Sequence, residues 1–131
     1  MLSIDTNILI RFIVNDDKIQ SENILNYCNN QKIFITKTVL MESEWVLRFC
    51  YKIDKSEIFL FFQKLIGTSN LLIEDFFCVK RALDWYEKGF DFTDALHLSA
   101  SSGSTTFLTF DRKFAKKAHK FRINPTVYLL A

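Results

Sequence analysis

The stretch Leu2-Ser3-Ile4-Asp5-Thr6-Asn7 decides how the start of the chain is interpreted. Its apolar residues form a short run over 2–4, which is followed by an aspartate and then by an amphipathic segment over 7–14. A short apolar run predicts a strand, whereas apolar residues at helical spacing predict a helix. The beginning of the chain is therefore predicted to be a strand and a helix with an acidic side chain between them.

The same alternation of short apolar runs and longer amphipathic segments continues to the end of the chain. We predict strands over 2–4, 33–35, 71–73, 107–110 and 126–129, and helices over 7–14, 17–29, 39–52, 55–66, 75–88, 93–102 and 112–120. Parallel strands need crossover connections of about a dozen residues or more, and the intervening helices supply them. This order predicts an α/β fold with a mostly parallel central sheet and helices on both faces.

Length and composition are those of an ordinary globular protein. The chain has 131 residues, of which 49% are hydrophobic and 24% charged, and it has only three glycines and one proline. We therefore expect a single domain over residues 1–131 without a long linker. The longest uncharged stretch, 95–110, is rich in serine and threonine, and the first residues do not resemble a secretory signal. We expect a cytoplasmic protein that does not contact a membrane.

Two aspartates follow predicted strands. Asp5 comes after the strand over 2–4, and Asp111 comes after the strand over 107–110. In an open parallel sheet the ligand crevice lies outside the carboxyl ends of the strands, so both side chains are predicted to face one crevice. Either residue alone is also explained as a helix N-cap, because aspartate commonly caps a helix that follows a strand.

The helix predicted over 39–52 carries two glutamates that helical geometry separates. Trp45 and Phe49 lie on the same helical face as Glu42, which predicts that Glu42 points to the apolar side. Glu44 is predicted to point to solvent with Arg48 as its i, i+4 partner. A carboxylate on an apolar face is unfavourable unless it is paired, protonated or bound to a metal. Glu42 is thus a candidate metal ligand, and a buried ion pair is the alternative.

Two further acids fall at the start of the helix predicted over 93–102. Asp91 is best explained as the N-cap, and Asp94 would lie in the first turn, where the helix dipole also favours an acid. Carboxylate oxygens without nearby His or Cys pairs suit magnesium or manganese and disfavour zinc. Crowded carboxylates repel one another unless a divalent ion neutralises them.

Basic residues are concentrated near the C-terminus, although the net charge of the chain is only +2. The segment 112–122 contains no acid, and its basic residues are Arg112, Lys113, Lys116, Lys117, Lys120 and Arg122. A solvated helix face explains such a run, and a phosphate-binding patch is the sharper hypothesis. We take Lys113, Lys116 and Lys117 as candidate contacts to the phosphates of a nucleic acid.

Four motifs together resemble the acidic motifs of VapC-type PIN-domain toxins, and they occur in the family's order. These motifs are Ile4-Asp5-Thr6-Asn7, Glu42-Ser43-Glu44-Trp45-Val46-Leu47, Phe92-Thr93-Asp94-Ala95-Leu96 and Leu108-Thr109-Phe110-Asp111-Arg112. The resemblance implies a PIN-like three-layer fold and a magnesium-dependent endoribonuclease. It implies that Asp5, Glu42, Asp94 and Asp111 hold one or two ions and activate a water for attack on an RNA phosphodiester. Thr6 and Asn7 would brace the site, and Asp91 would orient a ligand or a metal-bound water.

The resemblance also implies partners. A VapC-like toxin forms a homodimer and is blocked by a cognate antitoxin that covers the acidic cleft. The apolar stretch Ile58-Phe59-Leu60-Phe61-Phe62 is where we first place the antitoxin contact or the dimer seam, with ordinary core packing as the alternative.

Other function classes remain open. A non-catalytic PIN-like or receiver-like binding module is one, although all four expected acids are present and no lysine occurs at the late strand end 128–130. An aspartyl-nucleophile phosphohydrolase generally has a second aspartate two residues after the first, where this chain has Asn7. A housekeeping RNA-processing nuclease is the third alternative, and a neighbouring antitoxin gene would distinguish the toxin from it.

Overall fold

Strands and helices alternate along the chain as the sequence predicts. The computed structural model describes residues 1–15 and 17–131. In chain order the elements are β1 (Leu2–Ser3), α1 (Thr6–Val14), α2 (Lys18–Cys28), β2 (Ile33–Ile35), α3 (Lys37–Phe49), α4 (Lys55–Ile66), β3 (Leu71–Ile73), α5 (Phe76–Glu87), α6 (Phe92–Ala100), β4 (Thr106–Thr109), α7 (Arg112–Lys120) and β5 (Thr126–Leu129). No described helix is both long and apolar enough to cross a membrane.

All strand pairs are parallel, which confirms the predicted α/β class. β1 pairs with β2 and β2 with β3, and Ile33 of β2 lies between Leu2 and Leu71. β4 pairs with β5, with Thr106 opposite Thr126. The strands form two sheets, one of three strands and one of two, where the sequence led us to expect a single central sheet. β1 and β4 therefore belong to different sheets.

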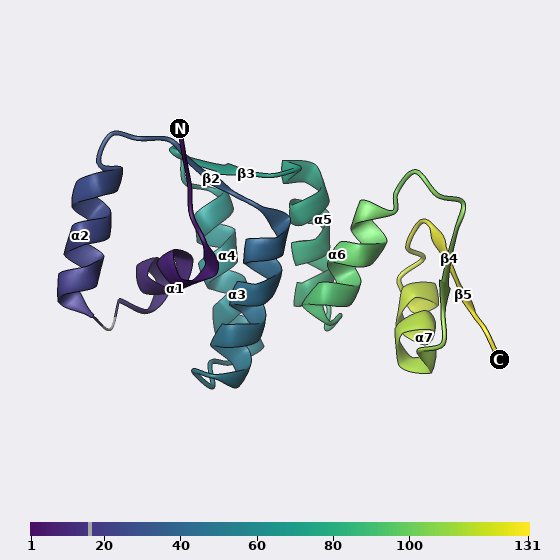
Figure 1. Ribbon diagram of the computed structural model, residues 1–131. Coiled ribbons are helices and arrows are strands. Elements are labelled where there is room, and N and C mark those ends of the chain that lie inside the picture. Colours follow the sequence, from purple (N-terminus) through teal and green to yellow (C-terminus); the bar gives the residue numbers. More distant parts are fainter. Residues whose placement is uncertain (16) are drawn as a thin grey trace.

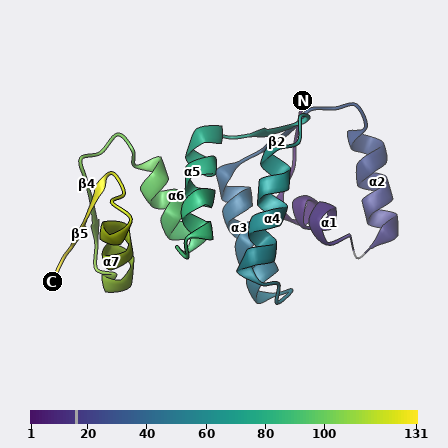
Figure 2. The same ribbon diagram turned by 180° about the vertical axis from the view of Figure 1, so that it is seen from behind.

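The helices fill the space between and around these sheets. Figures 1 and 2 show α3, α4, α5 and α6 side by side, with α1 and α2 at one end of the molecule and β4, α7 and β5 at the other. α5 and α6 pack extensively on each other, and α3 contacts α1, α4 and α6. α2 contacts α1 and has no buried residue.

Large aromatic rings dominate the core. Phe92 is fully buried, and its ring centroid lies 5.3 Å from that of Phe62 and 5.3 Å from that of Tyr86. Ile58 and Phe62 of the apolar stretch in α4 are also fully buried, as the core-packing alternative for that stretch required. Only Leu60 in the stretch is mostly exposed.

The unit formed by β4, α7 and β5 is joined to the rest of the molecule through Phe90, which is 2% exposed. Its ring centroid lies 6.1 Å from that of Phe114 and 6.0 Å from that of Phe121. The same contact is reinforced by Lys117, whose ammonium donates to the Gly89 carbonyl oxygen at 2.7 Å. The loop between α5 and α6 thus holds the C-terminal unit through a ring cluster and a hydrogen bond.

Candidate functional site

Three of the predicted site aspartates are helix N-caps. The residues are Asp5 for α1, Asp91 for α6 and Asp111 for α7. In each case Oδ1 accepts a hydrogen bond from the backbone N–H three residues later, at 3.1, 3.0 and 3.0 Å respectively. The capping explanation is correct for all three, and it does not exclude a second role. A cap fixes the carboxylate through one oxygen and leaves the other oxygen for a further partner.

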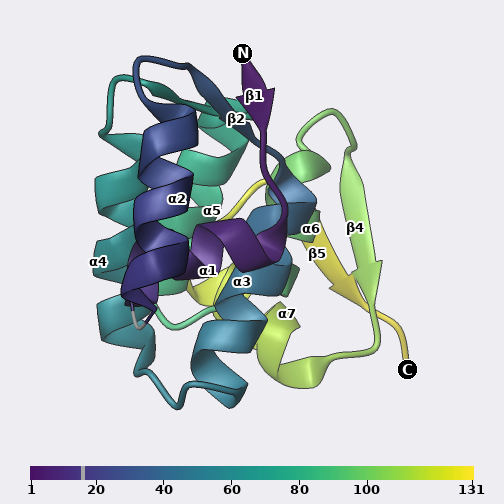
Figure 3. The same cartoon turned by 60° about the vertical axis from the view of Figure 1, so that its left-hand side comes forward.

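An open pocket brings residues from α1, α3 and α6 together. Among the side chains that line it are Asp5, Thr6 and Asn7 at the start of α1, Glu42 and Trp45 on α3, and Thr93 on α6. α1 and α3 pack on each other, and Figure 3 shows the start of α1 beside α3. Two of the predicted ligands, Asp5 and Glu42, and both predicted bracing residues therefore face one pocket, which we call the acidic pocket.

The two glutamates of α3 are placed the opposite way from the prediction. Glu42 is exposed at the acidic pocket, whereas Glu44 is 1% exposed. The buried residues of α3 are Leu40, Ser43, Glu44 and Leu47, which form a stripe at i, i+3, i+4 and i+7. That stripe faces the core, so the face shared by Glu42 and Trp45 is exposed. Glu42 keeps its place as a candidate ligand, but the argument from an apolar face was wrong.

A hydrogen-bond network compensates the burial of Glu44. Arg48 Nε donates to its Oε2 at 2.8 Å, and the Tyr86 hydroxyl donates to the same oxygen at 2.9 Å. Burial, followed by the charge of Glu44, raises the pKa of Tyr86, so this hydroxyl remains a donor. The predicted Glu44–Arg48 pair is present, but Glu44 is buried and Arg48 is partly buried, so the pair does not lie in solvent as expected.

The network extends from the core to the start of α6. Arg48 Nη2 lies 3.4 Å from Asp91 Oδ2, and the other oxygen of Asp91 accepts the backbone N–H of Asp94. Asp91 therefore joins the Glu44–Arg48 ion pair of α3 to the helix turn that carries Asp94. Its role in orienting a ligand or a metal-bound water stays a prediction.

Asp94 is half-buried and electrostatically coupled to the neighbouring acids. Burial raises its pKa, and the charges of Asp91 and Asp111 raise it further, while His97 opposes them. Asp94 and Asp111 therefore lie within electrostatic reach of each other. Asp94 is also the neighbour of Thr93, which lines the acidic pocket.

The four predicted ligands are not assembled into one tight cluster. Within residues 1–15 and 17–131, no group of three or more His, Cys, Asp or Glu side chains is close enough to hold a metal ion. Asp5 follows β1 and Asp111 follows β4, and these strands belong to different sheets. The donor set itself consists of carboxylate oxygens, which fits a hard cation such as magnesium or manganese.

The basic residues of α7 separate into two groups. Lys113 and Lys116 are exposed, and α7 begins directly after Asp111. Lys117 is tied to the protein, since it donates to the Gly89 carbonyl and its ammonium lies 5.6 Å from the centroid of the Phe90 ring. These contacts favour a packing role for Lys117 over the predicted phosphate contact.

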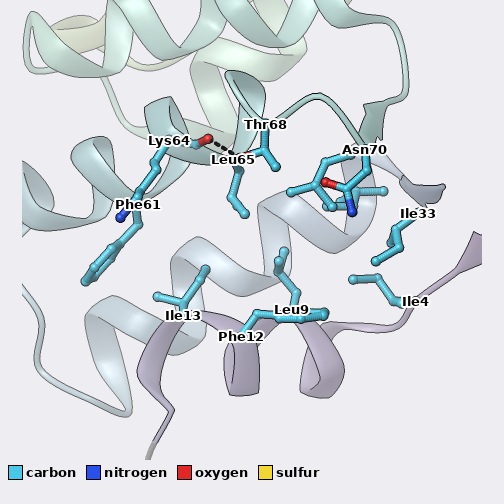
Figure 4. Close-up of a pocket in the computed structure, with 12 residues that line it drawn as sticks. Ile4, Leu9, Phe12, Ile13, Ile33, Phe61, Lys64, Leu65, Thr68 and Asn70 are labelled. Carbon is cyan, nitrogen blue, oxygen red and sulfur yellow. Dashed lines mark hydrogen bonds between the residues drawn. The ribbon is translucent and has the colours of Figure 1, made fainter. Parts of the chain in front are cut away.

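A second cavity is apolar and lies between α1 and α4 (Figure 4). Its volume is about 350 Å³, and Figure 4 shows Leu9, Phe12 and Ile13 of α1 opposite Phe61 and Leu65 of α4. No acid lines it among the described residues, so it is distinct in chemistry from the acidic pocket. Phe61 belongs to the apolar stretch that we singled out as a partner contact.

Comparison with known families identifies the fold. The PIN domain family model matches residues 2–120, which includes all four acidic motifs and every element from β1 to α7. Neither the curated proteins nor the solved structures contain a match to this chain. Because the match covers most of the sequence, the chain belongs to the PIN domain family.

Proposed function

We propose that this protein is a divalent-metal-dependent endoribonuclease that acts as the toxin of a toxin–antitoxin pair. PIN domains are generally nucleases that use divalent metals, which supports the reaction class. The observation that carries the proposal is the acidic pocket, where Asp5 and Glu42 come together from α1 and α3 beside Thr93 of α6. Burial raises the pKa of Asp94, the next residue along α6, and the charges of Asp91 and Asp111 raise it further.

Each residue has a role that follows from its position. Asp5 and Asp111 are each held by a capping hydrogen bond through one carboxylate oxygen, and the other oxygen of each would be available to Mg²⁺ or Mn²⁺, with Glu42 and Asp94 as the further ligands that we propose. The bound ion would activate a water and stabilise the charge that develops on the phosphate. Thr6, which is 8% exposed, and Asn7 would support the pocket wall.

The substrate would be held beside the site by exposed basic side chains. Lys113 and Lys116 lie in the helix that Asp111 caps, so a strand bound at Asp111 would pass close to both ammonium groups. Phosphate contacts of this kind contribute affinity without reading sequence. RNA is therefore the substrate class that we propose.

The toxin role requires partners, and the apolar cavity is where we propose the antitoxin contact. Leu9, Phe12 and Phe61 line a cavity large enough for apolar side chains of a bound segment. α2, which packs on α1, also leaves Ile19 and Tyr27 about three-quarters exposed. A homodimer is the second partnership that we propose.

Metal-dependent cleavage of RNA tests the reaction class. The parent protein should cleave single-stranded RNA with magnesium or manganese and should stop when EDTA is in excess. Asp5→Asn should reduce cleavage to background, whereas Asp84→Asn, an exposed aspartate on α5, should cleave like the parent. Cleavage that continues in EDTA would refute the metal mechanism, and magnesium binding without cleavage would favour the non-catalytic binding module.

A further inference from the structure

Two aromatic side chains stand exposed on the outer face of α3. Trp45 is 54% exposed and Phe49 is 45% exposed, and their ring centroids lie 5.3 Å apart with the planes tilted by 44°. The guanidinium carbon of Arg48 lies 4.4 Å from the centroid of the Phe49 ring. We call Trp45 and Phe49 the α3 aromatic pair.

The pair is continuous with the acidic pocket. Trp45 lines that pocket together with Asp5 and Glu42, and it follows Glu42 by three residues on the same helical face. Phe49 continues this face by one more turn, away from the pocket. A ligand that occupies the acidic pocket and extends along α3 therefore meets first the indole and then the phenyl ring.

The chemistry of this surface matches an unpaired nucleobase. Every base presents a flat π-face, and stacking on exposed aromatic side chains is how single strands are commonly bound without sequence reading. Bases inside a duplex are already stacked and paired, so such a surface discriminates in favour of unpaired RNA. The Arg48 guanidinium lies over the Phe49 ring, but its charge is already paired with Glu44 and Asp91, so the rings themselves are the proposed contact.

We propose that Trp45, extended by Phe49, is a stacking platform for an unpaired base of RNA whose backbone lies at the acidic pocket. The proposal rests on the proposed function, because it takes RNA as the substrate. It adds to that function a specific site where an unpaired base would bind.

Another exposed aromatic pair serves as the control. Phe76 and Phe77 on α5 have ring centroids 5.4 Å apart and are 39% and 78% exposed. Like the α3 aromatic pair they are two exposed neighbouring rings on one helix, but they do not line the acidic pocket. If exposure alone determined RNA binding, substitutions in both pairs would weaken it. The proposal predicts that only substitutions in the α3 aromatic pair do so.

Tryptophan fluorescence tests the contact directly. The chain has two tryptophans, and Trp85 is 8% exposed, so Trp85→Phe leaves Trp45 as the only indole. A short phosphorothioate RNA strand, which resists hydrolysis, is titrated with magnesium and compared with its duplex. We expect quenching by the single strand and little change with the duplex. If Trp85→Phe does not fold, the fluorescence of Trp45 is obtained by subtracting the spectrum of Trp45→Phe from that of the parent, with and without RNA.

Affinity measurements supply the second readout. Trp45→Ala should weaken binding of the single strand by about fivefold or more, as expected for one lost stacking contact. Trp45→Phe should restore most of that affinity, and Phe77→Ala should bind like the parent. Unquenched Trp45 together with unchanged affinity of Trp45→Ala would overturn the proposal.

The outcomes separate this proposal from the proposed function. If Asp5→Asn abolishes cleavage while Trp45→Ala binds and cleaves like the parent, the stacking platform is wrong and the nuclease assignment stands. If Trp45 is quenched by RNA but no variant or metal produces cleavage, the platform stands and the nuclease assignment fails. If Trp45→Ala converts a dimer to a monomer in sedimentation without changing RNA affinity, the α3 aromatic pair is a contact between two copies, and the stacking proposal is wrong.

Discussion

At the scale of single residues, the two glutamates of α3 show how burial assigns roles. Glu42 is exposed at the acidic pocket, and a change there removes a candidate ligand without disturbing the core. Glu44 is buried with Arg48 and Tyr86 as donors. Removing one partner of a buried charged hydrogen bond leaves the others unsatisfied, and that is strongly destabilising.

The glutamate variants should therefore separate activity from stability. We expect Glu42→Gln to abolish RNA cleavage while its free energy of unfolding stays near that of the parent. Glu44→Gln should lower the free energy of unfolding by about 1–3 kcal/mol, because Arg48 and Tyr86 lose a charged acceptor. Urea denaturation and RNA cleavage measured on both variants check this. If Glu42→Gln unfolds while Glu44→Gln keeps the stability of the parent, our placement of the two side chains is wrong.

Asp94 should make stability depend on pH. Burial and the charges of Asp91 and Asp111 raise its pKa in the folded state above the value in the unfolded chain. Ionised Asp94 therefore destabilises the fold above the raised pKa, and this cost disappears as the pH falls to the ordinary pKa of an aspartate.

The matching experiment uses metal-free buffer. Asp94→Asn should melt at a higher temperature than the parent at pH 7.5, and the difference should shrink as the pH is lowered towards 4. Asp84→Asn should follow the parent at every pH. A lower melting temperature for Asp94→Asn at pH 7.5 would show that the carboxylate of Asp94 is stabilised by the fold.

At the scale of elements, helix termini set the geometry of the site. α1, α6 and α7 each begin at an aspartate that caps the helix. The cap of α6 is also held from the side by Arg48 of α3, so the position of Asp94 depends on a contact between two helices. α7 begins at its cap Asp111, so the exposed Lys113 and Lys116 lie in the first turns after this residue.

The lysines of α7 should differ in their effect on RNA binding. Replacing Lys113 and Lys116 with Gln should weaken binding of single-stranded RNA and flatten its salt dependence by about 0.7 in slope per lost phosphate contact. Lys117→Gln should leave that slope unchanged and lower the melting temperature, because its bond to the Gly89 carbonyl is lost. If only Lys117→Gln changed the salt dependence of RNA binding, Lys117 would be the residue that contacts RNA.

At the scale of the whole molecule, the site depends on how two units are held together. Asp5 and Glu42 belong to the part built around β1–β3, whereas Asp111 belongs to the β4–α7–β5 unit. Phe90 packs against Phe114 and Phe121 and so joins these parts. The relative position of the acids is therefore sensitive to one buried ring.

Truncation of that ring should affect both stability and catalysis. Phe90→Ala should lower the free energy of unfolding by about 3–5 kcal/mol, the usual cost of removing a buried phenylalanine. Phe90→Leu is a milder change. We expect this variant to remain folded but to cleave RNA more slowly than the parent. Phe77→Ala, at an exposed ring, should change neither quantity. Full cleavage by folded Phe90→Leu would show that the joint does not position the acids.

The order and bounds of the elements could be predicted from sequence because their signals are local. Hydrophobic periodicity over a few residues placed β2, β3, β5, α4 and α7 at their observed bounds, and no other predicted end is wrong by more than three residues. The aspartates at helix starts were predictable for the same reason, since an N-cap is a contact between residues three positions apart.

Only the tertiary structure decided which face of α3 is buried, which lysine of α7 is engaged, and that the strands form two sheets. Large apolar residues made the Trp45 face of α3 look like the core face, but Arg48 and Tyr86 satisfy Glu44 in the interior. Tyr86 is distant in sequence, and local patterns do not contain such a contact. Sequence by itself determined where helices and acids occur, and non-local packing determined which of them face one another.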